Sequence, residues 1–288
     1  MTLFDINAFD LDAYLARIGA THLGRGRPSG RPSADLQTLN HLAILHPCVI
    51  PFENLNPLMR RPLRLDIASI QDKLVRDARG GWCFEHNLLL GTALTTLGFD
   101  VVGLSARVVW NVPPGVVRGR SHMVLHVRLD GRSYIVDVGF GGSTPTGPLL
   151  LEADTVQQTP HEPFRLTAAD NSFLLEAQLE GTWRGLYLFD LQPQALADYE
   201  MPNWYLCNHP DSHFLIAVVA ARVERDRRYA LRNNELAVHY PDRPSERRTL
   251  GSAGDVRQAL TEVFHINVPD WPDLDETLER LVQPVGSR

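Results

Sequence analysis

Residues 79–87 read Arg-Gly-Gly-Trp-Cys-Phe-Glu-His-Asn, and the interpretation of the whole chain starts from this stretch. An apolar run with helical spacing begins beside Cys83 and continues to Leu97, where Gly98 is expected to end it. Cys83 should therefore lie in the first turn of a helix, where free backbone N–H groups and the helix dipole favour an anion. A thiol there loses its proton more readily than a free one. The two glycines before it are expected to give the backbone conformational freedom.

The composition is that of an ordinary globular protein. The chain has 288 residues, 44% hydrophobic and 22% charged, with a formal net charge of −6. This acidic balance argues against a nucleic-acid binder that relies on bulk positive charge. Three cysteines, Cys48, Cys83 and Cys207, do not suggest a secreted disulfide framework. Without a signal peptide or an apolar stretch of roughly 18–20 residues, we expect a cytoplasmic protein with no membrane contact.

Hydrophobic periodicity changes twice along the chain, which suggests three parts. Length alone is compatible with two domains or with three small ones. The first hundred residues are mainly helical, short strands that suggest a closing antiparallel barrel follow Phe99, and a mixed α/β part begins near Pro202. Helices are expected at 9–19, 33–46, 66–76, 83–97, 252–264 and 274–281. Strands are expected at 101–112, 122–129, 132–140, 164–166, 173–179, 183–190, 213–224, 228–232 and 236–240.

A predicted hairpin offers partners for Cys83. Two apolar-rich runs joined by Asp130-Gly131 favour a two-residue loop, which pairs residue 129 with residue 132. In that register His122 and Asp137 point to one face as diagonal neighbours, whereas a three-residue loop would separate them. An aspartate inside an apolar run is costly unless it is paired, and an imidazole N–H suits it. The three residues then form a nucleophile, a base and an orienting group.

The same register assigns the two faces of the hairpin. The apolar face should belong to a core and consists of Met123, Leu125, Val127, Leu129, Tyr134, Val136, Val138 and Phe140. The face of His122, with His126, Arg128, Ser133 and Asp137, is polar and suits a cleft.

At these residues the sequence resembles the arylamine N-acetyltransferase family. Residues 79–87 fit its signature Arg-Gly-Gly-x-Cys-x-Glu-x-Asn, and the order Cys, His, Asp fits as well. Residues 134–141 match the segment that carries the family's aspartate, and residues 51–55 match its early motif. The resemblance implies an α+β, multidomain fold with a cysteine-protease-like Cys-His-Asp core. Its expected domains are an N-terminal helical bundle (1–98), a central antiparallel β-barrel (99–200) and a C-terminal α/β lid (201–288).

The resemblance also implies an activity and its site. Members move acetyl from acetyl-CoA to the nitrogen of arylamines or arylhydrazines by a ping-pong mechanism through an acetyl-cysteine. This activity would give the protein a role in xenobiotic metabolism. Cys83, His122 and Asp137 would be catalytic. Ser121, Phe140 and Gly141 would line the thiol arm of coenzyme A and the acyl pocket. The expected partners are coenzyme A and a small aromatic amine or hydrazine, with no metal and with either a monomer or a homodimer.

Other interpretations remain open for the same residues. An amide synthase of the same fold would act on a larger biosynthetic substrate, and a thiol hydrolase or transglutaminase-like enzyme uses the same triad. A binding protein with a buried cysteine is the non-catalytic alternative. Glu85 and Asn87 are expected to be buried hydrogen-bonding supports. The arginines between Arg222 and Arg228 suit either a phosphate or, more simply, a solvated turn.

Overall fold

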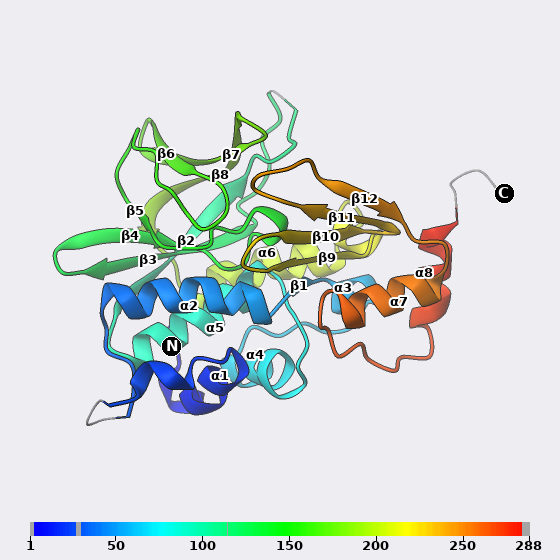
Figure 1. The fold of residues 1–288 in the computed structure, drawn as a ribbon, viewed down its shortest axis with the longest axis horizontal. Helices are drawn as coiled ribbons and strands as arrows, with labels where there is room; N and C mark the ends of the chain where they lie inside the picture. Colours follow the sequence, from blue (N-terminus) through cyan, green and yellow to red (C-terminus); the bar gives the residue numbers. More distant parts are fainter. Residues whose placement is uncertain (1–2, 27–29, 114, 284–288) are drawn as a thin grey trace.

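The computed structural model of the chain describes residues 3–26, 30–113 and 115–283. The helices of the first hundred residues lie below a curved seven-stranded sheet, and a five-stranded sheet with two C-terminal helices lies beside them (Figure 1). The α+β class, with helices and a nearly closed barrel sheet, is confirmed. Among the described residues, no helix is long and apolar enough to cross a membrane.

Eight α-helices are described. They are α1 (Leu11–Arg17), α2 (Leu36–Val49), α3 (Leu55–Leu58), α4 (Ile67–Gln71), α5 (Cys83–Thr96), α6 (Leu196–Asn208), α7 (Ala253–Glu262) and α8 (Leu274–Val282). Short turns are η1 (Ile6–Ala8), η2 (Thr21–Gly24), η3 (Asp72–Arg76), η4 (Gly141–Ser143) and η5 (His213–Leu215). The η3 turn is π-helical and continues α4, and the other four are 3₁₀-helical.

Two helix predictions need correction. Asp35, and not Ser33, caps α2 by accepting a hydrogen bond from the N–H of Thr38, and the helix continues through Pro47. Pro47 is tolerated because it lies in the last turn and is buried, so packing outweighs the lost backbone hydrogen bond. Helix α6 was missed because it contains Pro202 and lacks a regular apolar stripe.

The seven-stranded sheet has the order β5-β4-β3-β2-β8-β7-β6. Its strands are β2 (Asp100–Val108), β3 (His122–Leu129), β4 (Arg132–Val136), β5 (Leu149–Leu150), β6 (Phe164–Ala169), β7 (Ser172–Leu179) and β8 (Thr182–Pro193). Single bridges from Ala153 to Leu166 and from Gln157 to Phe164 join the segment after β5 to β6 at the opposite edge. These bridges bring the sheet close to a closed barrel.

The five-stranded sheet joins distant parts of the chain. Its order is β1-β9-β10-β11-β12, from β1 (Phe52–Glu53), β9 (Val219–Val223), β10 (Arg228–Arg232), β11 (Glu235–His239) and β12 (Glu246–Thr249). The strand expected at 213–224 starts only at Val219, because η5 precedes it. The domain boundaries at residues 98 and 200 stay a prediction, and the outer ranges include termini that lie outside the described residues.

The hairpin of β3 and β4 has the predicted register. Leu129 pairs with Arg132, and both loop residues, Asp130 and Gly131, have positive φ values of 51° and 75°. This conformation is the one that a two-residue turn needs to match the twist of its strands. The predicted two-residue loop, and the strand register that follows from it, are therefore confirmed.

The faces of this hairpin are partly as expected. The predicted apolar residues from Met123 to Val138 pack in one core with the residues of α5. Phe140 does not belong to that face, because β4 ends at Val136 and the chain turns, so its side chain packs in the barrel core. Val124 and Ile135, on the side of His122, also lie in the barrel core, and the expected polar face is therefore partly apolar.

Candidate active site

Cys83 is the first residue of α5, as the sequence predicts. The preceding residue, Trp82, is the N-cap, and its N–H donates to Oε2 of Glu85 at 3.0 Å. Cys83 is 8% exposed, and its Sγ lies 3.6 Å from the carbonyl oxygen of Ser121. The thiol therefore sits at the positive end of the helix, in contact with the start of β3.

The two glycines before the cysteine have a different role from the expected one. Neither has the positive φ that would require glycine. A Cβ on Gly80 would lie 2.1 Å from the carbonyl oxygen of Pro51, and one on Gly81 would lie 2.7 Å from Oε2 of Glu85. Both positions need glycine because other atoms approach the backbone too closely for a side chain.

His122 and Asp137 meet through a short hydrogen bond. The Nε2 of His122 lies 2.7 Å from Oδ2 of Asp137, and both side chains are buried. The second oxygen, Oδ1, accepts from Nδ2 of Asn87 at 3.0 Å and from the N–H of Gly139 at 2.9 Å. An ionised carboxylate can only accept hydrogen bonds, so Nε2 of His122 is the donor to Asp137. The other ring nitrogen, Nδ1, is left for the thiol of Cys83.

Gly139 brings the segment of Asp137 against Cys83. A Cβ at this position would lie 2.7 Å from Cα of Cys83 and 3.1 Å from Nδ2 of Asn87. Asn87 lies one helical turn after Cys83 and also donates to the carbonyl of Met123 at 2.8 Å. Helix α5 and the hairpin are therefore joined on both sides of the aspartate, and Asn87 is the buried support that was expected.

Charge stabilises the protonated imidazole. Burial alone would lower the pKa of His122, but the carboxylate of Asp137, its hydrogen bond and the thiol of Cys83 raise that pKa to about 10. Burial opposes ionisation of Asp137, and the bonds from His122, Asn87 and Gly139 nevertheless hold its pKa below the ordinary value. The pair therefore favours an imidazolium beside a carboxylate near neutral pH.

Two aromatic rings surround His122. The ring of Tyr187 lies 4.8 Å from it and that of Phe140 lies 5.2 Å away, between centroids. Burial and the charge of Asp137 raise the pKa of Tyr187 well above its ordinary value. Sequence reasoning missed Tyr187, because only the pairing of β8 with β2, and of β2 with β3, brings it to this site.

Two of the three residues expected to contact coenzyme A lie against Cys83 or His122, and the third, Gly141, follows Phe140 in the chain. Ser121 receives the thiol contact through its carbonyl, and Phe140 packs edge-on against His122. Gly141 has a φ of 80° and begins η4, where a Cβ would lie 3.6 Å from the ring of Phe52. Their role toward coenzyme A stays a prediction.

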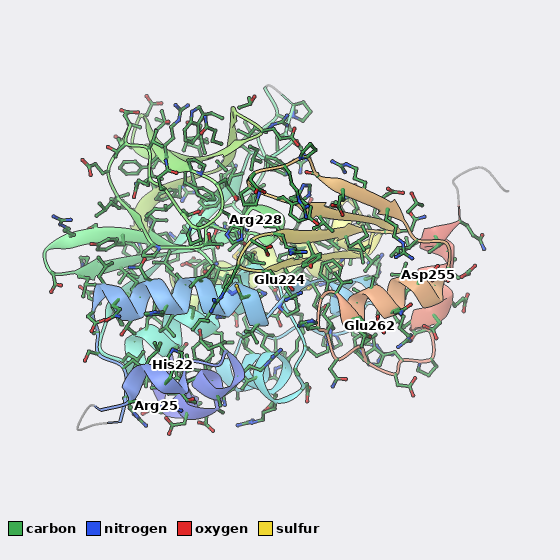
Figure 2. The ribbon with its side chains drawn as sticks, in the orientation of Figure 1. His22, Arg25, Glu224, Arg228, Asp255 and Glu262 are labelled. Atoms are coloured by element: carbon green, nitrogen blue, oxygen red, sulfur yellow. The ribbon has the colours of Figure 1, made fainter. Side chains whose placement is uncertain are left out.

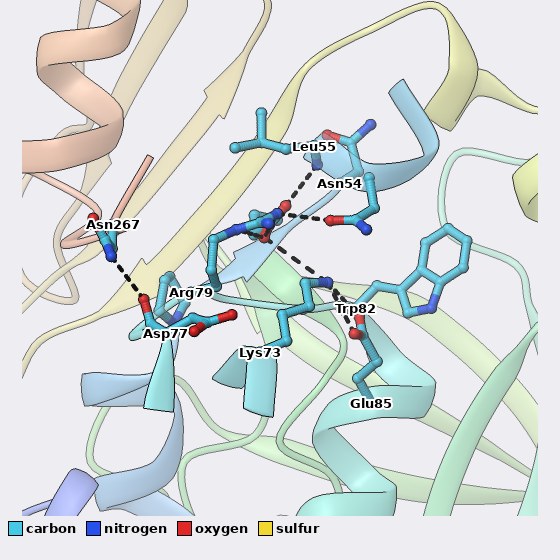
Figure 3. A network of polar contacts seen from close by, with 12 residues as sticks. Asn54, Leu55, Lys73, Asp77, Arg79, Trp82, Glu85 and Asn267 are labelled. Atoms are coloured by element: carbon cyan, nitrogen blue, oxygen red, sulfur yellow. Dashed lines mark hydrogen bonds and ion pairs between the residues drawn. The ribbon is translucent and has the colours of Figure 1, made fainter. Parts of the chain in front are cut away.

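A network of buried charges includes Lys73, Arg79 and Glu85 (Figure 3). Oε1 of Glu53 accepts two hydrogen bonds from the guanidinium of Arg79, at 3.0 Å from Nε and 2.5 Å from Nη2. Nζ of Lys73 lies 2.8 Å from Oε1 of Glu85 and 3.9 Å from Oε1 of Glu53. Alternating charges thus connect Glu85, which accepts the N–H of the N-cap residue Trp82, with Glu53 of β1.

The arginines between Arg222 and Arg228 are largely used inside the protein. Arg222 binds the carboxylate of Glu224 and the carbonyl of Val263, and Arg228 binds the carboxylate of Glu162. Glu224 and Arg228 lie where the two sheets meet (Figure 2). Arg222 and Arg228 are buried, so neither a solvated turn nor a phosphate site describes these two residues.

A chain of hydrogen bonds supports the same glycine segment from the helical side. Nε2 of His86 lies 3.1 Å from the carbonyl oxygen of Gly81, which can only accept, so Nε2 carries the proton. Nδ1 of His86 then accepts from Nε2 of His46 at 2.8 Å, and Nδ1 of His46 accepts from the hydroxyl of Tyr14 at 2.9 Å. Burial lowers the pKa of His86 to about 4 and that of His46 well below its ordinary value, so both rings are neutral.

We expect Tyr14→Phe to lower the free energy of unfolding by about 1–3 kcal/mol, because Nδ1 of His46 is left buried without a donor. Urea unfolding at pH 7 measures this loss. Tyr205→Phe is the control, since Tyr205 is 44% exposed. An equal and small effect of both substitutions would contradict the assigned direction of the chain of bonds.

Comparisons with known proteins show the family of the chain. A family model described as N-acetyltransferase matches residues 35–271. The arylamine N-acetyltransferase of Mycolicibacterium smegmatis is 44% identical over 273 residues, which cover 93% of this chain and 96% of that protein. The Escherichia coli arylamine N-acetyltransferase is 36% identical over 261 residues, 90% of each chain.

Solved structures give the same result. The Mycobacterium marinum arylamine N-acetyltransferase in complex with CoA superposes with a TM-score of 0.88 at 38% identity, covering 94% of this chain and 99% of that one. The M. smegmatis arylamine N-acetyltransferase structure has a TM-score of 0.89 at 41% identity, covering 96% and 100%. With most of its length and its fold shared, the chain is an enzyme that belongs to the arylamine N-acetyltransferase family.

Proposed function

We propose that this enzyme transfers an acetyl group from acetyl-CoA to the nitrogen of an arylamine or arylhydrazine by a ping-pong mechanism, with Cys83, His122 and Asp137 as the catalytic residues. The observation that carries the proposal is the bond of 2.7 Å between His122 and Asp137, which leaves the other imidazole nitrogen for the thiol of Cys83. The M. marinum relative, whose structure was solved in complex with CoA, supports coenzyme A as the carrier.

In the first half-reaction, the thiolate of Cys83 attacks the acetyl carbonyl of acetyl-CoA. A bond from Sγ to the carbonyl carbon forms, the bond to the coenzyme A sulfur breaks, and the leaving thiolate takes the proton from His122. One thioester replaces another, so the step is near balance. The N–H groups of the first turn of α5 are suited to stabilise the oxyanion of the tetrahedral intermediate.

In the second half-reaction, the neutral amine attacks the acetyl-cysteine. Its nitrogen forms the amide bond, the bond to Sγ breaks, and His122 accepts the proton of the amine, which restores the starting pair. Asp137 keeps the imidazole in one orientation and stabilises its charged form. Aromatic amines suit this step because they are neutral near pH 7.

We assign Ser121, Phe140 and Gly141 to the thiol arm of coenzyme A and the acyl pocket. Support comes from their position, since Ser121 contacts the thiol of Cys83 and Phe140 packs against His122. Gly141 adopts a conformation that a side chain would strain.

The intact mass after mixing with acetyl-CoA alone tests the proposal. We expect a gain of one acetyl group and release of one equivalent of coenzyme A, and no gain for Cys83→Ala, because the nucleophile is gone. Cys207→Ala is the matched control and should keep the adduct. Cys207 is a half-buried thiol, and burial raises its pKa to about 12. Absence of both adduct and coenzyme A release would reject the proposal.

Acceptor specificity separates the remaining alternative. The acetyl-enzyme should react with small arylamines and arylhydrazines, with loss of the added mass. If only larger amines discharge it, the amide synthase of the same fold is the better description.

A further inference from the structure

Lys73 is the only lysine of the chain, whose other basic residues are arginines. It lies in η3, the π-helical turn that continues α4, and its side chain is 13% exposed. Single π-helical turns are rare in proteins, and those that occur are often found at functional sites. The turn closes through the N–H of Asp77, which donates to the carbonyl of Asp72 at 2.8 Å. An unusual backbone segment thus places the one lysine in the interior.

The ammonium of Lys73 holds both oxygens of one carboxylate. Its Nζ lies 2.8 Å from Oε1 and 3.0 Å from Oε2 of Glu85 (Figure 3). Oε2 also accepts the N–H of Trp82 at 3.0 Å, and it approaches Gly81 so closely that a Cβ there would lie 2.7 Å away. The carboxylate is therefore clamped between Lys73 and the backbone immediately before Cys83.

Glu85 depends on this ammonium for its charge. Burial raises its pKa above the ordinary value, and the charge and hydrogen bonds of Lys73 act in the opposite direction. The carboxylate of Glu53, 3.9 Å from Nζ of Lys73, raises the pKa of Glu85 further. Without Lys73, Glu85 would take up a proton at a higher pH, and a protonated carboxyl group accepts a weaker hydrogen bond from Trp82.

We propose that Lys73 is a positioning residue for acyl transfer, which keeps the Glu85 carboxylate ionised and in place so that Glu85 fixes the Gly81–Trp82 peptide immediately before Cys83 and aims the thiol at His122. The inference rests on the proposed role of Cys83 as nucleophile. Lys73 acts only through Glu85 and touches no reacting atom.

The main test compares Lys73→Met with the double variant Lys73→Met/Glu85→Gln. The rate of Cys83 alkylation by iodoacetamide and kcat/KM for acetyl-CoA are measured from pH 5 to 9. We expect Lys73→Met to lower both by about tenfold to a hundredfold at pH 6, because the thiol is misplaced. The loss should shrink as Glu85 ionises at higher pH. The double variant should lack this added pH dependence, since glutamine keeps the acceptor oxygen and does not titrate.

Two further variants separate positioning from general damage. Arg228→Met also removes a buried cation from its carboxylate, that of Glu162, and should lower Tm without changing the pH dependence of either rate. Lys73→Arg keeps the charge and should restore most of the wild-type pH profile. The proposal is overturned if Lys73→Met keeps the wild-type profile, or if the added pH dependence persists in the double variant.

A measurement on the wild-type chain does not depend on the stability of any variant. With [13Cε]lysine, the single lysine gives one side-chain NMR signal. We expect this signal to shift when Cys83 is alkylated or acetylated, and an unchanged signal would contradict the coupling. If acetyl-CoA fails to acylate Cys83 while its alkylation still depends on Lys73, the proposed function fails and the positioning role stands.

Discussion

Replacing Asp137 by asparagine is expected to lower kcat/KM by about 10³–10⁴-fold, the size of effect known when a triad loses its carboxylate. The reason is the set of donors around it. His122, Asn87 and Gly139 all donate to the oxygens of Asp137. An asparagine must direct its NH₂ group at one of these donors, so the imidazole turns or changes tautomer. Steady-state kinetics with acetyl-CoA and an arylamine measures the loss.

The same substitution should change how stability depends on pH. The pKa of His122 is raised to about 10, so its stabilisation is full below the unfolded value of about 6.5 and is lost as pH rises through 10. The pKa of Asp137 is lowered, so its share is present above about 3.9 and is lost as pH falls. Urea unfolding should therefore show the largest difference between wild type and Asp137→Asn from about pH 4 to 6.5, and a smaller one toward pH 10.

Asp100→Asn is the matched control. Asp100 pairs with Arg128 across the same sheet, but both side chains are more than half exposed. Its loss should change the free energy of unfolding by about 0–1 kcal/mol and leave kcat/KM within about twofold. Wild-type activity in Asp137→Asn, or an equal loss in Asp100→Asn, would show that the carboxylate does not orient the base.

Gly139→Ala is expected to lower the free energy of unfolding by about 1–3 kcal/mol, the typical cost of overpacking. The new Cβ would lie 2.7 Å from Cα and 3.0 Å from the carbonyl oxygen of Cys83, and backbone atoms cannot move aside as a flexible side chain can. The segment of Asp137 would separate from α5. We expect acyl transfer to fall by about a hundredfold, since a displacement of about 1 Å has that effect.

Gly142→Ala tests whether the effect comes from this contact. A Cβ on Gly142 meets no atom within 4 Å, and its φ lies outside the left-handed region. Its unfolding free energy and kcat/KM should stay close to those of the wild type, within about 0.5 kcal/mol for stability. Similar losses in both variants would point to a general sensitivity of the loop, and not to close approach at Cys83.

The hairpin shows how much local sequence can predict. Asp130-Gly131 selects a two-residue turn, and alternation along β3 and β4 then determines which side chains share a face. The prediction failed at Phe140, because a strand end depends on partners that the chain meets elsewhere. Helix α6 was missed for a related reason, since Tyr199 and Leu206 stabilise it by packing and not by a periodic stripe.

The network around Lys73 shows what local sequence cannot predict. Lys73, Glu53 and Arg79 come from a π turn, a two-residue strand and the loop before Cys83. Their contacts require these segments to be buried together, and no spacing along the chain records that. The same holds for Tyr187, which reaches His122 only through the strand order of the barrel sheet.

The sequence by itself determined the family, the helix start at Cys83 and the turn that sets His122 and Asp137 on one face. Each of these depends on residues close together in the chain, through periodicity, capping and turn chemistry. Only the tertiary structure decided that Cys83 meets His122 and Asp137. That contact exists because Gly139 lets its backbone approach that of Cys83, and because Asn87 of α5 donates to Asp137 and accepts from the N–H of Val138. Such packing between distant segments is determined by the folded core.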